Sequence, residues 1–186
     1  MKERPILFSG PMVRAILEGR KTVTRRVVKD TGFYAIDAAI HGNDVALRER
    51  EALSTRCPFG QPGDRLWVRE TFADIGCRLT FRADLEDGAH CSVTRWTPSL
   101  HMPRWASRIL LEITSVRVER LQDISEEQAI AEGPPGLAFP APPGSHWVTE
   151  DGRRRAFMRL WDDVNGAGAW DANPWVWVVE FKRVTP

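Results

Sequence analysis

The spacing of apolar and polar residues predicts a compact set of elements near the N-terminus. Apolar residues at helical spacing extend over residues 11–18, with Pro11 in the first turn and Gly19 as a stop, which predicts a helix. The following stretch, 22–28, is rich in β-branched residues and favours a strand. A short apolar run at 6–8 favours a strand before the helix.

Further along the chain, alternating patterns predict strands at 65–72, 109–121 and 175–181. A short helix is expected from Ser125 to Glu132, since Ser125 and Gln128 have the spacing of a capping box. An amphipathic helix is expected over 153–165. This order of elements favours an α+β fold built on a small mixed β-barrel, rather than a doubly wound sheet.

Length and pattern together indicate one domain over residues 1–186. Three stretches have weak periodicity or many turn-forming residues and are expected to be loop insertions, at about 29–61, 73–104 and 133–172. Within the first of these, a strand is expected near 44–48. Short helices and these insertions would then surround the barrel.

Composition narrows the class of protein only slightly. The chain has 26 basic and 25 acidic side chains and a pI near 7.8, so it lacks the strong positive charge of a protein that coats duplex DNA. No run of apolar residues reaches membrane-spanning length, and no secretory signal is evident. Together with three cysteines in no disulfide pattern, this favours the cytoplasm.

The candidate metal ligands in the sequence are Cys77, His90, Cys91 and His101. Their spacing fits no common zinc-binding pattern, so neither a metal nor another cofactor is expected.

The strongest chemical signal is a basic segment at residues 19–26, directly after the first helix. It concentrates Arg20, Lys21, Arg25 and Arg26 together with two threonine hydroxyls. A solvated basic turn is the ordinary explanation for such a run. Here the apolar helix before it and the strand after it attach the segment to the core, which favours a cleft for an anionic or strongly polar ligand.

Several motifs in order along the chain resemble the ASCH domain, a member of the superfamily with the PUA-type β-barrel. The G-x-K-x-x-T/E-x-R signature is matched by Gly19, Lys21, Thr24 and Arg26, and the G-D-x-L-x-V strand by Gly63, Asp64, Leu66 and Val68. The stretches 112–114, 121–132 and 178–182 resemble the family's second half. More narrowly, residues 6–26 resemble a phage and prophage group often labelled morphogenetic. The matches cover roughly half of the chain.

One ASCH branch, the bacterial N(4)-acetylcytidine amidohydrolases, uses a lysine, a threonine and a glutamate. The resemblance places these catalytic roles on Lys21, Thr24 and Glu132. Lysine of lowered pKa would activate the threonine hydroxyl as nucleophile, and glutamate would protonate the leaving amine and activate water. For convergence, the turn at Gly19 must reorient Lys21, because residues 21 and 24 lie on opposite faces of an unbroken strand. Taken singly, a surface cation, a strand-forming threonine and a helix-end carboxylate explain the three residues equally well.

Residues expected to bind the substrate are Arg25, Arg26, Glu70, Trp96 and Trp105. The arginines suit an oxyanion or phosphate, and the two tryptophans suit base stacking, with core packing as their alternative. A strand-end ion pair explains Glu70 equally well.

The expected partner is a modified nucleoside, a nucleotide or RNA, with no membrane involved. Two rivals to deacetylation remain open, a non-catalytic RNA or nucleotide binder and a ribonuclease. A structural role in a phage particle is a third class, which no specific feature of the sequence supports.

Overall fold

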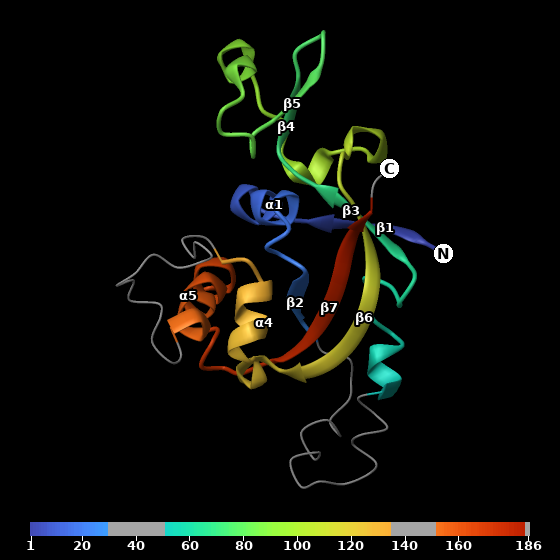
Figure 1. Cartoon of the computed structure of the whole chain (residues 1–186), viewed down its shortest axis with the longest axis vertical. Helices are drawn as coiled ribbons and strands as arrows, with labels where there is room; N and C mark the ends of the chain where they lie inside the picture. Colours follow the sequence, from blue (N-terminus) through green and yellow to red (C-terminus); the bar gives the residue numbers. More distant parts are fainter. Residues whose placement is uncertain (30–50, 135–151, 185–186) are drawn as a thin grey trace, which may run out of the picture.

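The computed structural model describes residues 1–29, 51–134 and 152–184 (Figure 1). The described strands are β1 (Glu3–Leu7), β2 (Val23–Val27), β3 (Arg65–Arg69), β4 (Phe72–Asp74), β5 (Leu79–Phe81), β6 (Leu110–Arg120) and β7 (Trp175–Val184). The described helices are α1 (Gly10–Leu17), α4 (Glu126–Ala131) and α5 (Gly152–Asn165), with 3-10 helices η2 (Gly88–Ser92), η3 (Ser99–His101), η4 (Arg104–Ala106) and η5 (Leu121–Asp123). The mixed α+β class expected from the sequence is confirmed.

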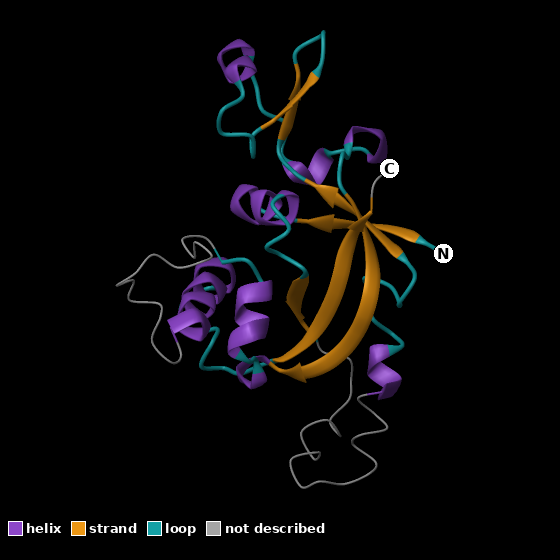
Figure 2. Cartoon of the chain, viewed as in Figure 1, coloured by secondary structure: helices purple, strands orange, loops and turns teal. Residues whose placement is uncertain are grey.

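The main sheet has five strands in the order β1-β3-β6-β7-β2 (Figure 2). The pair β1–β3 is parallel and the other pairs are antiparallel, so the sheet is mixed. Strands β6 and β7 form its long curved centre, with a register shift between Ile113 and Ser115. Within the described residues β1 and β2 are the edges of this sheet, so the sheet is not shown closed into the barrel that the sequence predicted.

Apolar clusters cover both faces of this sheet. Successive residues of β7 point to opposite faces: Val179 belongs to the cluster that includes α1, and Val178 to the cluster that includes α5. In the first cluster Val13 and Ile16 of α1 are buried, and in the second Phe157 of α5. Strand β7 is therefore buried on both sides, which fixes its register and that of β2 beside it.

The expected strand at 65–72 is divided into two strands in different sheets. Strand β3 ends at Arg69, and after two residues β4 pairs with β5 as a separate two-stranded sheet, at the top of Figure 1. The insertion expected at 73–104 thus contains a small hairpin and 3-10 helices. A short packed cluster of Phe72, Met102 and Ala106 joins it to the rest of the chain.

The other insertions are described only in part. Residues 51–54 are helical, and α5 lies within the insertion expected at 133–172. The strand expected near 44–48 falls outside the described residues. The longest helix described is α5, with 14 residues, and no helix of the described ranges is long and apolar enough to cross a membrane.

Candidate functional site

Lys21 is positioned by the way that α1 ends. Gly19 adopts φ +75°, and the backbone N–H groups of Arg20 and Lys21 both donate to the carbonyl of Ala15, at 2.8 and 3.0 Å. Strand β2 begins only at Val23, so the side chain of Lys21 is not governed by the alternation of the strand. The Gly19 turn therefore sets the orientation of Lys21 independently of β2, and the contacts of its Nζ atom are with Glu132 and the Val23 carbonyl.

Glu132 is positioned by α4, a helix of six residues that is defined at both ends. Ser125 and Gln128 form the expected capping box at its start, and Glu132 is the C-cap. The next residue, Gly133, has φ +63° and ends the helix. A backbone hydrogen bond of 2.9 Å from Thr22 N to the Ala131 carbonyl then joins the end of α4 to the start of β2.

These two backbone arrangements bring Lys21 and Glu132 into direct contact. The Nζ atom of Lys21 donates to Glu132 Oε2 at 2.7 Å, to the Glu132 carbonyl at 2.8 Å and to the Val23 carbonyl at 2.8 Å. The Lys21 side chain is 0% exposed and that of Glu132 is 4% exposed. An ammonium group has three donors, so each donor of Lys21 has an acceptor.

Glu132 also holds a second buried cation on the other side of its carboxylate. Arg25 Nη1 donates to Glu132 Oε1 at 3.1 Å, and Arg25 Nη2 donates to Glu119 at 2.6 Å and to Gln128 at 2.7 Å. The ion-pair network then continues along the sheet through Arg117 to Glu180. Glu132 is therefore the shared acceptor that joins the basic segment to the sheet and to α4.

Burial changes the proton affinity of these cations. Removal from water lowers the pKa of Lys21 below its ordinary 10.5, while the neighbouring Glu132 carboxylate opposes that change. Burial also lowers the pKa of Arg26, again with Glu132 acting in the opposite direction. A lysine of lowered pKa is closer to the proton affinity that a general base requires.

Thr24 and Arg26 lie on the face of β2 that carries the α1 cluster, opposite to Arg25. Thr24 is paired with Val179 and is buried. Arg26 Nη2 donates to the Leu7 carbonyl at 2.7 Å. The ring of Phe8 lies 5.4 Å from the Arg26 guanidinium and 5.6 Å from Lys21 Nζ, so both cations approach the same aromatic ring.

The other expected binding residues have different surroundings. Glu70 accepts two hydrogen bonds from Arg108, at 2.9 and 3.0 Å, and has no recorded contact with Lys21, Thr24 or Glu132 in the described part of the chain. This is the strand-end ion pair that the sequence left open as its alternative, and burial raises the pKa of Glu70.

The two candidate stacking residues differ in exposure. Trp96 is half-buried against His90 in an edge-on contact with ring centroids 5.0 Å apart. Trp105 is 71% exposed. Among the described residues, neither tryptophan side chain contacts the buried network of Lys21, Arg25 and Glu132. The structure therefore does not place the two tryptophans at this network.

A cavity of about 320 Å³ lies beside the ion-pair network. It is lined by Thr22, Val23, Thr114, Glu127, Gln128, Ala131, Glu180 and Phe181. Val23 and Gln128 belong to both the cavity wall and the network, since each supplies an acceptor to a buried cation. The register shift of β6 falls at Thr114, and such irregularities are frequent beside functional sites.

Sequence reasoning did not identify Glu119 and Gln128 as members of the site. One signal was present: Arg117 and Glu119 are two charged residues of opposite sign on one face of a strand, two positions apart. Among the described residues, no group of three or more His, Cys, Asp or Glu side chains could hold a metal ion.

Comparisons with known proteins give one structural likeness. No family model matches the sequence, and no curated protein matches it. The chain is similar to the crystal structure of an ASCH domain from Lactobacillus crispatus JV V101, with 15% sequence identity, coverage of 98% of this chain and 79% of that chain, and a TM-score of 0.40. At this identity the likeness concerns the fold alone, and at this score it adds no weight to any function.

Proposed function

We propose that this chain is an ASCH-type amidohydrolase that removes the acyl group from the exocyclic nitrogen of a nucleoside, with N(4)-acetylcytidine as the first substrate to test. The observation that carries the proposal is the buried contact of 2.7 Å between Lys21 Nζ and Glu132 Oε2. The two residues are 111 positions apart in the sequence. Their proximity supplies a proton-transferring pair on the same edge of the sheet as Thr24.

In this mechanism, Thr24 is the nucleophile and Lys21 its base. Neutral Lys21 takes the proton of the Thr24 hydroxyl, and the oxygen attacks the acyl carbon to give a tetrahedral intermediate. The C–N bond then breaks, and the leaving amine takes a proton from the Lys21–Glu132 pair. Water then hydrolyses the acyl-threonine: the same pair accepts a proton from water and returns it to the Thr24 oxygen as the C–O bond breaks, which restores neutral Lys21. Arg26, on the same face as Thr24, is the cation that stabilises the oxyanion.

The cavity of about 320 Å³ beside the ion-pair network is the proposed place for the nucleoside. Lys21, Thr24 and Glu132 do not line it, so the substrate must displace part of its wall at Val23 and Gln128 to reach them. The volume of the cavity lies at the lower end of the range of small-molecule sites, about 300 to 1,000 Å³. Two carboxylates, Glu127 and Glu180, line it, and no lysine or arginine does. This lining disfavours a phosphate, so a free nucleoside fits the cavity better than a nucleotide.

A second candidate is a non-catalytic nucleoside or RNA binder, and the completeness of the ion-pair network favours it. Lys21 has an acceptor for each of its three donors, and Thr24 is 3% exposed. Hydrolysis therefore requires the substrate to displace one of these contacts and to uncover Thr24. In a binder, by contrast, the network would serve only as a rigid wall.

The test is chromatography of N(4)-acetylcytidine after incubation with the purified protein. We expect cytidine from the wild type and from Thr24→Ser, which keeps the hydroxyl, and none from the near-isosteric Thr24→Val or from Lys21→Met. Unchanged substrate with the folded wild type would exclude this substrate. Calorimetric binding of the same nucleoside, with equal affinity in wild type and Thr24→Val, would then establish the binder.

A further inference from the structure

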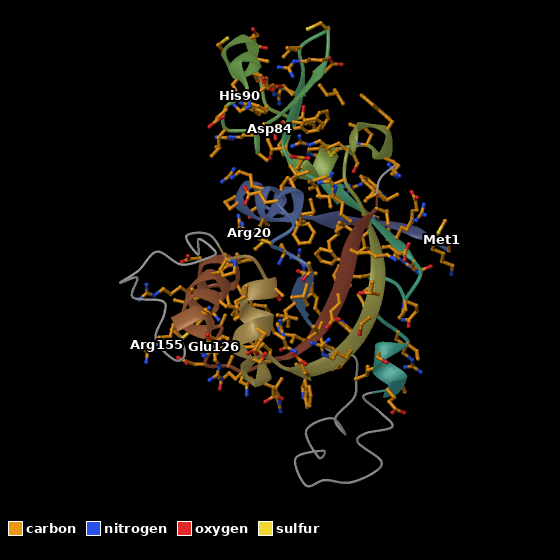
Figure 3. The ribbon with its side chains drawn as sticks, in the orientation of Figure 1. Met1, Arg20, Asp84, His90, Glu126 and Arg155 are labelled. Atoms are coloured by element: carbon orange, nitrogen blue, oxygen red, sulfur yellow. The ribbon has the colours of Figure 1, made fainter. Side chains whose placement is uncertain are left out.

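A second cavity, of about 210 Å³, lies on the α5 side of the molecule. Its lining consists of Gln122, Arg154, Arg155, Met158 and Trp170, none of which is acidic. Figure 3 shows Arg155 on the same side of the molecule as Glu126 of α4 and far from Met1. Neither the buried network of Lys21, Arg25 and Glu132 nor the residues of the 320 Å³ cavity line this second cavity, so it is a separate site.

The two arginines of this cavity lack the carboxylate partners that many arginines of this chain have. Arg155 is exposed, and its side chain has no hydrogen bond or ion pair with the described residues. Arg154 donates from Nη2 to the neutral carbonyl of Gln122 at 2.5 Å, and its Nε is buried without a partner. Two guanidinium groups thus line a hollow whose described wall has no carboxylate, and two nearby carboxylates, Glu126 and Asp162, bind backbone N–H groups beside it.

The wall that carries Arg154 is held in place by its own contacts. The guanidinium lies 5.6 Å from the ring of Trp170. Gln122 Nε2 donates to the Trp170 carbonyl at 3.0 Å, and Trp170 N donates to Asp162 at 2.8 Å. A guanidinium fixed in this way loses little side-chain entropy when it binds a ligand.

The backbone N–H groups of Arg153 and Arg154 at the start of α5 are already occupied and do not contribute to this site. Glu126 accepts the backbone N–H groups of Arg153 and Arg154, at 3.3 and 3.1 Å. The binding capacity therefore comes from the two guanidinium groups, whose planar donors match the oxygens of a phosphate.

We propose that this cavity is a phosphate-binding site, for the phosphate group of a free nucleotide or of a single RNA strand. Arg155 would supply the accessible charge, and Arg154 the fixed donor beneath it. The acidic nucleoside cavity and this basic cavity would then recognise different parts of a substrate, the one a base and the other a phosphate.

The test compares CMP with cytidine, which differ only in the phosphate, by calorimetry at low salt. We expect the wild type to bind CMP more tightly than cytidine, and Arg155→Ala to weaken CMP binding by about tenfold, the effect of one charge-assisted hydrogen bond. Arg159→Ala is the matched control, because Arg159 is an exposed arginine of the same helix that does not line the cavity. Cytidine binding should be the same in all three proteins.

A labelled oligocytidylate distinguishes the two sources of phosphate. Oligonucleotide binding that depends on Arg155, with weak CMP binding, would identify an RNA strand as the ligand, and the reverse would identify a free nucleotide. Equal losses in Arg155→Ala and Arg159→Ala, or no binding of either phosphate compound, would overturn the proposal. Neither result depends on deacetylation, so the two proposals can fail independently.

Discussion

At the scale of single residues, the position of Glu132 between two buried cations predicts an order of stability. Glu132→Gln leaves Lys21, which is 0% exposed, without any anion, and we expect a loss of about 3–5 kcal/mol in the free energy of unfolding. Lys21→Met leaves Glu132 paired with Arg25 at 3.1 Å, so it should cost less. Urea denaturation at pH 7 measures both values.

The matched control is Glu112→Gln, which removes the carboxylate of another glutamate–lysine pair. Glu112 is 29% exposed and its partner Lys182 is 61% exposed, at an N–O distance of 2.8 Å. A solvent-screened pair in this setting contributes little to stability. If Glu132→Gln were as mild as Glu112→Gln, or milder than Lys21→Met, the charge of Glu132 would not be what holds Lys21.

The lowered pKa of Lys21 predicts a pH dependence of stability. Between the lowered pKa in the folded state and the ordinary 10.5 of the unfolded chain, the unfolded state binds more protons. The free energy of unfolding attributable to Lys21 therefore rises with pH in that interval, by up to about 1.4 kcal/mol per unit. The difference between wild type and Lys21→Met, followed by urea denaturation from pH 8 to 10, should grow in favour of the wild type. A constant difference would mean that burial does not lower this pKa.

At the scale of residues, the sequence predicted part of the candidate site. The resemblance identified Lys21 and Glu132, and the structure brings them into contact. The partners of Arg25 were not predictable, because its contacts with Glu119 and Gln128 span 94 and 103 residues and depend on how β6 and α4 pack. Local pattern contains no information on such distances.

At the scale of elements, the packing at the end of α4 predicts that a single added methyl group at Gly133 strongly lowers the stability of the fold. Gly133 has φ +63°, and a Cβ there would lie 2.9 Å from the Cβ atoms of Ala15 and Lys21. Gly133→Ala should therefore cost more than the strain of the left-handed conformation alone, at least about 2 kcal/mol, and should displace Lys21. Thermal and urea unfolding measure the cost.

Gly168→Ala separates strain from contact. Gly168 has a similar φ of +79°, but a Cβ there would have nothing within 4 Å. This variant should lose only about 1–2 kcal/mol, the cost of the left-handed conformation. Equal losses in the two variants would show that α1 and α4 can separate at this point without penalty, contrary to the packing described.

The sequence predicted best the helices that have several helical turns and the strands that have several alternations of apolar and polar residues. The helix expected at 153–165 is α5, Gly152–Asn165, and the strand expected at 109–121 is β6, Leu110–Arg120. Strands β4 and β5 were not predicted, since three residues each offer too few alternations to reveal a period. Their pairing instead depends on packing against Met102 and Ala106.

At the scale of the whole molecule, the sequence predicted the α+β class but not how the sheet is arranged. Strands β1 and β3 are neighbours although 57 residues separate Leu7 from Arg65, and their parallel pairing is not evident from their own patterns. Whether a sheet closes depends on such distant pairings and on bulges, which composition does not encode. The α+β class is therefore confirmed, and the closure of the sheet into a barrel stays a prediction.

The distribution of charge over the molecule makes a final prediction about nucleic acid. The net charge is only +1, and many of the arginines are held by carboxylates, as Arg25, Arg108 and Arg117 are. If RNA binds through Arg154 and Arg155 alone, about two phosphates are neutralised, and log K should fall with log salt at a slope of about −1.4. Arg155→Ala should halve that slope, and Arg159→Ala should leave it unchanged. Fluorescence anisotropy of a labelled oligocytidylate, at salt concentrations from about 50 to about 200 mM, would measure the slope in each protein. A slope several times steeper would indicate a broad basic surface, which a chain with nearly balanced and largely paired charges does not provide.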